Sequence, residues 1–277
     1  MNSQFLNTLF ESHHRAKHQV PASAMCKLVE GVLQLLFPPL ADVRFETVQE
    51  LEEFSNGLKV NMMRILTSME RELPMSPEVI SERMMQELPH IYELLLMDAE
   101  AIAAGDPAAQ SIEEVVRTYP GFKAVAMYRM AHALYQLEVP LLPRVLTEYA
   151  HARTGIDIHP GARIGTHFCI DHGTGIVIGE TCVIGNYVKV YQGVTLGALS
   201  VDKAMANIKR HPTIENNVVI YAGATILGGN TVVGANSLVG GNVWLTESVP
   251  PYSRVYHRPQ IDVRRSAESA NVINFSI

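Results

Sequence analysis

A period of six residues fills the second half of the chain. From Gly155 onward an aliphatic or aromatic residue returns at every sixth position: Ile158, Ile164, Ile170 and Ile176; after a slip of two residues Ile178, Ile184, Val190 and Leu196; after a longer break Ile214, Ile220, Ile226, Val232, Leu238 and Trp244. A helix repeats at 3.6 residues and a strand at two, so neither explains six. A hexapeptide repeat is typical of a parallel β-helix, in which three short strands and three corners form one triangular coil. We expect the periodic side chains to fill its core.

Two interruptions of the period carry polar residues. The slip lies in IDHGTGIVIGE (170–180), where Asp171 and His172 stand among glycines. A charged pair is costly in a core unless it is satisfied, so this pair is expected on the outside of the wall. The longer break, ALSVDKAMANIKRHP (198–212), ends in Arg210 and His211. Insertions leave a solenoid as loops, so this segment is either a solvated excursion or an arm that reaches a site on the wall.

The first half has a helical period. In 48–69 the apolar residues fall on one helical face, at Val48, Leu51, Phe54, Leu58, Met62, Ile65 and Met69. A second helix is expected to begin with Ser76 as N-cap and Pro77 at its first position, to be kinked or split at Pro89, and to end at Gly105. Further helices are expected over 122–137 and 144–153. The expected organisation is α+β: an α-helical domain (1–153), a parallel β-helix (154–258) and a flexible tail (259–277).

Composition narrows the class of protein. The 277 residues carry a formal charge of −6, which argues against nucleic acid as the main partner because phosphate binding needs a basic face. No apolar run approaches the roughly 20 residues of a membrane span, and the first residues do not read as a signal peptide. Three cysteines, Cys26, Cys169 and Cys182, form neither an even set nor a CxxC pair. We therefore expect a cytoplasmic protein with reduced cysteines that does not bind a membrane.

Four motifs together resemble the serine O-acetyltransferase family: DIHPGARIG (157–165), DHGTGIVIGE (171–180), VTLGA (194–198) and RHP (210–212). The resemblance covers roughly residues 100–258 and includes the order of a helical domain, a hexapeptide domain and a short tail. It implies a left-handed β-helix and an acyltransferase that moves acetyl from acetyl-CoA to the hydroxyl of L-serine. The products are O-acetylserine and CoA, in the first step of cysteine synthesis from serine. No metal is implied.

The resemblance also assigns roles to individual residues. His172 matches the general base, and a histidine suits that work near neutral pH. Asp157 matches its carboxylate partner, which would fix the tautomer and stabilise the cation. Asp106 and Asp171 match the aspartates that hold the substrate ammonium. Arg210 and His211 match the pair that binds the substrate carboxylate, a role for which a guanidinium fork is suited. His159, His167 and Glu180 are interpreted as supporting or surface residues. A helix N-cap is the alternative for Asp106.

Coenzyme A is expected along the later coils, where small residues let its pantetheine arm approach the backbone. The matching positions are Ala222 and Gly240, and Gly197 with Ala198 is where a backbone N–H would steady the oxyanion. The chain departs from the family in two places. Ala198 replaces a glycine. Arg258 stands before a proline, whereas in relatives the arginine usually comes after the proline.

The resemblance further implies partners. Family members form trimers through the solenoid, often paired into hexamers through the helical domain, so residues 1–153 would be an oligomerisation domain. Cysteine inhibits relatives at the serine site. A tail ending in isoleucine, here Ile277, can enter the active site of O-acetylserine sulfhydrylase.

Three other functions are compatible with the same residues. One is a zinc enzyme like the hexapeptide-repeat carbonic anhydrases, using His167, His172 and either His159 or His211. A second is a non-catalytic scaffold that presents its tail to a partner. A third is an acetyltransferase with another acceptor, such as homoserine or a sugar.

Overall fold

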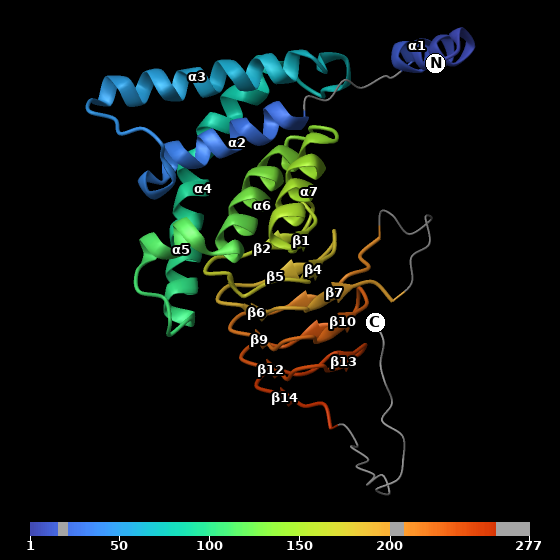
Figure 1. Ribbon diagram of the computed structural model, residues 1–277. Helices are drawn as coiled ribbons and strands as arrows, with labels where there is room; N and C mark the ends of the chain where they lie inside the picture. Colours follow the sequence, from blue (N-terminus) through green and yellow to red (C-terminus); the bar gives the residue numbers. More distant parts are fainter. Residues whose placement is uncertain (16–21, 200–207, 259–277) are drawn as a thin grey trace, which may run out of the picture.

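The computed structural model describes residues 1–15, 22–199 and 208–258, where a helical region precedes a solenoid of short strands (Figure 1). The helices are α1 (Ser3–Arg15), α2 (Ala22–Leu36), α3 (Val48–Thr67), α4 (Pro77–Gly105), α5 (Ile112–Thr118), α6 (Pro120–Gln136) and α7 (Leu142–Thr154), with 3-10 turns η1 (Pro38–Leu40) and η2 (Glu70–Glu72). Of the helices in these described ranges, none is long and apolar enough to cross a membrane.

The start of α4 confirms the sequence prediction. The hydroxyl of Ser76 accepts a hydrogen bond from the N–H of Val79, and Pro77 occupies the first helical position, where its missing N–H costs nothing.

The expectation that Pro89 splits the helix is wrong, because α4 continues through it to Gly105. Pro89 is exposed, while its neighbours Leu88 and Ile91 are buried. Packing of this buried face outweighs the hydrogen bond that the proline removes.

The solenoid is built from fourteen described strands in three parallel sheets. They are β1 (Asp157–Ile158), β2 (Arg163–Ile164), β3 (Cys169–Asp171), β4 (Val177–Ile178), β5 (Val183–Ile184), β6 (Lys189–Tyr191), β7 (Thr195–Gly197), β8 (Thr213–Ile214), β9 (Val219–Ile220), β10 (Thr225–Leu227), β11 (Val232–Val233), β12 (Leu238–Val239), β13 (Trp244–Leu245) and β14 (Arg254–Val255). Sheet A is β1-β4-β7-β10-β13, sheet B is β2-β5-β8-β11, and sheet C is β3-β6-β9-β12-β14. The chain thus circles through A, B and C about five times as a left-handed parallel β-helix, which confirms the predicted fold.

Strand register locates the slip of two residues. Ile158 pairs with Ile178, two positions beyond three hexapeptides, so the extra residues lie in the corner between β3 and β4. This is the corner that holds Asp171 and His172. The register also places the longer interruption between β7 and β8, inside the third coil.

The prediction for the last coils is wrong by one residue. Val232, Leu238 and Trp244 were expected inside, but Val233, Val239 and Leu245 pair with the buried residues Ile214, Ile220 and Ile226. Trp244 is 69% exposed. One residue more than a hexapeptide separates Ile226 from Val233. It is accommodated at Gly228, whose φ of 105° is available to glycine at little cost.

The helical region is fastened to the solenoid along β3. The N–H of Phe168 donates to the buried carboxylate of Asp98 on α4, at 2.9 Å. Gly121 of α6 lies so close that a Cβ there would stand 2.7 Å from the carbonyl oxygen of Ile170. In Figure 1, α6 and α7 accordingly lie directly above β1 and β2 at one end of the solenoid, and α4 lies to the side. The strand that leads into the enlarged corner is therefore held by two helices.

Candidate active site

The backbone of the enlarged corner is exceptional within the solenoid. Most left-handed residues form two stacked columns: Gly155, Gly175, Gly193, Gly223 and Asn242 between sheets C and A, and His167, Tyr187, Asn217, Asn236 and Tyr252 between sheets B and C. His172 (φ 57°) and Gly173 (φ 93°) belong to neither column. Left-handed φ is uncommon for residues other than glycine, and such outliers gather at functional sites. The insertion leaves the His172 side chain 76% exposed at the border of sheets C and A.

Asp171 stands between the ammonium of Lys189 and the imidazole of His172. Its Oδ2 lies 2.8 Å from the Nζ of Lys189 on β6, and its Oδ1 lies 3.7 Å from the Nε2 of His172. The Asp171 side chain is only 15% exposed. A carboxylate this sheltered is stabilised by polar partners within the protein. The acid–imidazole pair seen in the sequence therefore exists, with one oxygen of the acid directed to each neighbour.

Asp106 joins this group from the helical region. It follows α4 directly, and its carboxylate accepts hydrogen bonds from the Tyr119 hydroxyl (2.7 Å) and the Ala108 N–H (2.8 Å). These two hydrogen bonds, together with the nearby charges of Lys189 and His172, lower the pKa of Asp106, so it is a carboxylate at neutral pH.

The alternative that Asp106 is a helix N-cap is wrong. It is the C-terminal cap of α4, and Ser111 caps the next helix, α5. We call the group of Asp106, Asp171, His172 and Lys189 the His172 edge; it lies where sheet C meets sheet A.

Arg210 lies at a different corner, where sheet A meets sheet B. Its guanidinium forms an ion pair with Glu180, which also accepts a hydrogen bond from the Tyr135 hydroxyl of α6. The hydroxyl of Thr181 accepts from the backbone N–H groups of Arg210 (2.9 Å) and His211 (3.1 Å). The returning end of the 198–212 interruption is thus bound to the solenoid wall. We call the group of Glu180, Arg210 and His211 the Arg210 edge.

His211 is packed into this corner. It is 8% exposed, and its Nδ1 accepts a hydrogen bond from the N–H of Thr181. Burial, aided by the charge of Arg210, lowers the pKa of His211 to about 4. The ring is therefore neutral at pH 7, and the proton assigned to Nε2 makes that atom a hydrogen-bond donor.

Asp157 lies on β1 in sheet A, between the two edges. Its Oδ1 is 3.8 Å from the Nη1 of Arg144 on α7. Between Asp157 and His172, both in the described part of the chain, the structure contains neither a hydrogen bond nor an ion pair. One chain therefore brings Asp106, Asp171 and His172 together, and separately Arg210 and His211. The pairing of Asp157 with His172 remains a prediction.

The small residues predicted for coenzyme A divide between the same edges. Ala222 and Gly240 follow β9 and β12, so they continue the His172 edge along later coils. Gly240 donates its N–H to Val255 (2.8 Å), and the Ala222 carbonyl accepts from Asn242 (3.0 Å). Gly197 ends β7 and Ala198 follows it, so both lie on the side of the Arg210 edge.

Several contacting residues were missed from the sequence. Lys189, Tyr119, Thr181 and Lys209 each bond a predicted site residue or its neighbour. Lys189 could have been noticed, because it directly precedes the periodic Val190 and is therefore a charged residue at an outward position of a predicted strand. The others have no pattern that distinguishes them from ordinary surface residues.

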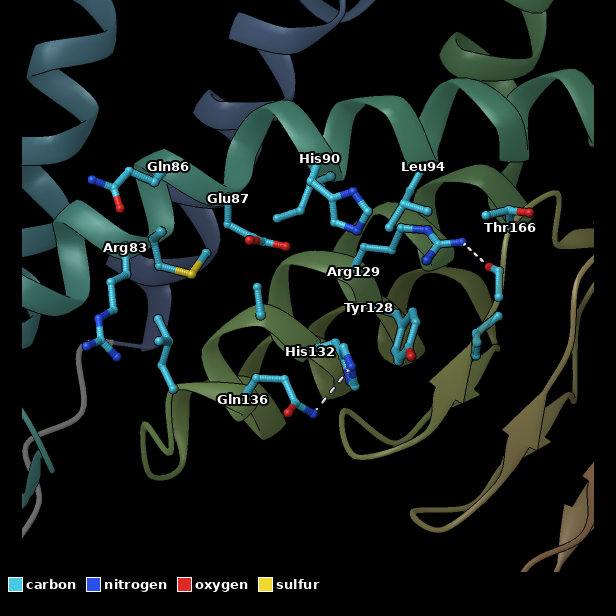
Figure 2. Close-up of a pocket in the computed structure, with 16 residues that line it drawn as sticks. Arg83, Gln86, Glu87, His90, Leu94, Tyr128, Arg129, His132, Gln136 and Thr166 are labelled. Atoms are coloured by element: carbon cyan, nitrogen blue, oxygen red, sulfur yellow. Dashed lines mark hydrogen bonds between the residues drawn. The ribbon is translucent and has the colours of Figure 1, made fainter.

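A cavity of about 690 Å³ opens elsewhere, between α4, α6 and the turn after β2 (Figure 2). Its walls include Glu87 and His90 of α4 and His132 and Gln136 of α6. His132 donates from Nδ1 to the Pro160 carbonyl at 2.7 Å. None of the predicted site residues lines this cavity, so cavity size does not identify the catalytic region here.

Comparison with known proteins gives a consistent result. No protein-family model matches the chain. A plasmid-encoded serine acetyltransferase of Synechococcus elongatus is 58% identical over 176 residues, which are 62% of this chain and 55% of that protein. The chain thus spans little more than half the length of the first curated relatives it matches.

Two solved structures extend the likeness to the fold. Serine acetyltransferase isoform 3 of Entamoeba histolytica, in complex with cysteine, has a TM-score of 0.75 and 36% identity; the match covers 87% of this chain and 84% of that one. A serine acetyltransferase in complex with CoA has a TM-score of 0.57 and 30% identity, covering 81% of this chain and 96% of that one. Both matches extend over the helical region and the solenoid of this chain.

Proposed function

Because this chain belongs to the serine acetyltransferase family, we propose that it transfers an acetyl group from acetyl-CoA to the hydroxyl of L-serine. The observation that carries this proposal is the division of charge between two edges of sheet A. The His172 edge offers an imidazole and two carboxylates, one of which is paired with Lys189. The Arg210 edge offers a neutral imidazole and a guanidinium that is paired with Glu180. These are the complements of an amino acid's ammonium and carboxylate.

We propose that the site is completed between subunits. The two edges border the same sheet, so copies arranged around an axis parallel to the solenoid would bring the His172 edge of one to the Arg210 edge of the next. We propose a homotrimer, the assembly that the family resemblance implies, and the helical region is available to pair trimers into a hexamer. The same contact would bring Asp157 of one copy toward His172 of another.

The proposed substrate contacts follow from charge. The serine ammonium binds Asp171 and Asp106, of which Asp106 has a lowered pKa. The serine carboxylate binds the guanidinium of Arg210 and the Nε2–H of His211. With both ends held, the hydroxyl is positioned at His172, and such positioning converts a bimolecular reaction into an effectively unimolecular one.

The proposed reaction uses His172 as general base. Its imidazole takes the hydroxyl proton as the serine oxygen attacks the thioester carbonyl, and Asp157 stabilises the resulting imidazolium. A backbone N–H near Gly197 and Ala198 steadies the oxyanion of the tetrahedral intermediate. The intermediate expels the CoA thiolate, which takes the proton from His172. No acetyl group is bound covalently to the protein at any stage.

Coenzyme A is proposed to lie along the His172 edge, where Ala222 and Gly240 leave space beside the backbone.

Further proposals concern regulation and partners. Cysteine, which shares the ammonium and carboxylate of serine, would compete for the same contacts. Ile277 would bind O-acetylserine sulfhydrylase; it lies outside the described residues. The free, buried thiols of Cys26, Cys169 and Cys182 suit the reducing cytoplasm.

A panel of acceptors tests the activity. Serine, homoserine and a sugar are supplied with acetyl-CoA, and released CoA thiol is measured. We expect serine to have the highest kcat/KM, and another preferred acceptor would disprove the assignment of Asp106 and Arg210. His172→Asn, which tolerates the left-handed backbone, is expected to lower kcat by about 10²- to 10⁴-fold without changing the assembly. An unchanged rate would show that His172 is not the general base, whereas a wild type without acetyl transfer would favour the scaffold function.

Zinc is the second chemistry to test. His167 stacks on Tyr187 at the corner of sheets B and C, whereas His172 lies at the corner of C and A. Within the described part of one chain, no three metal-binding side chains come together. Metal analysis of the purified protein distinguishes a zinc enzyme from the metal-free acetyltransferase. Stoichiometric zinc, with activity lost on chelation, would contradict the metal-free reaction proposed above.

A further inference from the structure

Lys189 lies at the junction of the helical region and the His172 edge. Its Nζ donates to the carbonyl oxygen of Gly105 at 2.7 Å and to Oδ2 of Asp171 at 2.8 Å. Gly105 is the last residue of α4, immediately before Asp106. One ammonium group therefore connects the backbone that carries one aspartate to the side chain of the other.

The environment of Lys189 keeps this ammonium charged and in place. Its side chain is only 18% exposed, and Nζ lies 4.6 Å from the ring centroid of Tyr191. Burial opposes the charge, but the hydrogen bond to Asp171 outweighs it and raises the pKa of Lys189 above its usual value. A cation–aromatic contact adds attraction on one side. The ammonium is therefore charged throughout the pH range of an ordinary assay.

We propose that Lys189 is a positioning residue for the amino group of the substrate, setting the spacing and orientation of Asp106 and Asp171. The proposal rests on the proposed acetylation of serine. Lys189 occupies Oδ2 of Asp171 and leaves Oδ1 on the side of His172, where the substrate would bind. Two carboxylates and one ammonium also leave a single uncompensated negative charge, which matches one substrate ammonium.

A purely structural ion pair would have different consequences. It would contribute to stability alone, so its loss would affect both substrates equally or neither. Positioning of the ammonium site instead acts on amino-acid ligands and spares acetyl-CoA, whose proposed contacts lie on later coils at Ala222 and Gly240. The ratio of the two KM values therefore separates the two roles.

The test compares Lys189→Met with Lys189→Arg and with the control Lys123→Met, which alters an exposed lysine of α6. For Lys189→Met we expect the KM for serine to rise about tenfold or more, the worth of one charge-assisted hydrogen bond. Inhibition by cysteine should weaken by a similar factor, while the KM for acetyl-CoA changes less than twofold. Lys189→Arg should restore part of the loss, and the control should equal wild type.

A second variant disturbs the same link from the other side. A Cβ on Gly105 would stand 3.1 Å from the Cys169 sulfur and 3.5 Å from the Lys189 Nζ. Gly105→Ala should therefore also raise the serine KM, and it keeps the test available if Lys189→Met does not fold. A serine KM that is unchanged, or lowered because Lys189 competes with the substrate, would overturn the inference.

Failure of the function and failure of the inference give different results. If the wild type does not acetylate serine, the proposed function fails. The link itself is then tested by amide hydrogen exchange at residues 105–109, which Lys189→Met should accelerate relative to Lys123→Met. If the wild type acetylates serine and Lys189→Met leaves its KM unchanged, the function stands and the role of Lys189 is refuted.

Discussion

The buried ion pair of Asp98 and Arg129 gives the sharpest stability prediction. Asp98 is fully buried and accepts from the Nε (2.6 Å) and Nη2 (3.0 Å) of Arg129, as well as from the N–H of Phe168. Arg129, whose side chain is 4% exposed, also donates to the Gly165 carbonyl at 2.8 Å, a bond visible in Figure 2. The pair thus joins α4, α6 and the approach to β3.

The expected magnitude follows from which groups lose their partners. Asp98→Leu leaves a buried guanidinium without its counter-ion, which costs about 3–5 kcal/mol. It also removes the acceptor of the Phe168 N–H, which costs about 1–3 kcal/mol more. In Asp98→Leu with Arg129→Met no buried charge remains, and only the Phe168 N–H and Gly165 carbonyl lose partners. The double variant should therefore be more stable than Asp98→Leu alone.

The assay is denaturant unfolding of the four proteins at one fixed protein concentration, because assembly shifts apparent stability. The coupling energy between the two sites should be large and favourable. The reasoning is refuted if Asp98→Leu lies within about 1 kcal/mol of wild type, or if the double variant costs as much as the two single variants combined.

Three further predictions concern other residues. Since burial lowers the pKa of His211 to about 4 from about 6.5 in an unfolded chain, the unfolded state binds the proton first, and stability should fall by up to about 3 kcal/mol as pH drops from 6.5 to 4. Urea titrations across that range should show a flatter profile for His211→Gln, and equal slopes would contradict the shift. Gly179→Ala would place a Cβ 2.0 Å from the His211 ring, so it should lower kcat/KM for serine at least about tenfold by displacing this ring and Arg210, as steady-state kinetics would reveal. Gly57→Ala, in an exposed turn of α3 with open space around it, should instead stabilise the protein by about 0.5–1 kcal/mol in thermal unfolding, and any loss would be unexpected.

The fold was predictable because its signal is periodic. Each inward aliphatic residue repeats the same environment one coil later, so many weak preferences agree. The same regularity explains the error at Trp244. One extra residue at Gly228 moved the inward position, while β-branched and aliphatic residues continued at both Val232 and Val233. Helix caps such as Ser76 were readable because their chemistry is local.

The site was predictable only in part. The slip beside Asp171 and His172 marked the enlarged corner, because an insertion in a repeat must leave the wall. Lys189 could not be assigned, since its importance depends on the end of α4 lying across β6, a contact between residues 84 positions apart. How Asp157 would meet His172 is not determined by one chain at all.

The placement of charge on opposite borders of sheet A gives the proposed ring a genetic property. Every polypeptide would contribute to two catalytic centres, lending its imidazole to one and its guanidinium to the other. A chain mutated at His172 and a chain mutated at Arg210, each inactive alone, would form some intact centres when co-expressed. Inheritance at this locus would then show complementation between alleles.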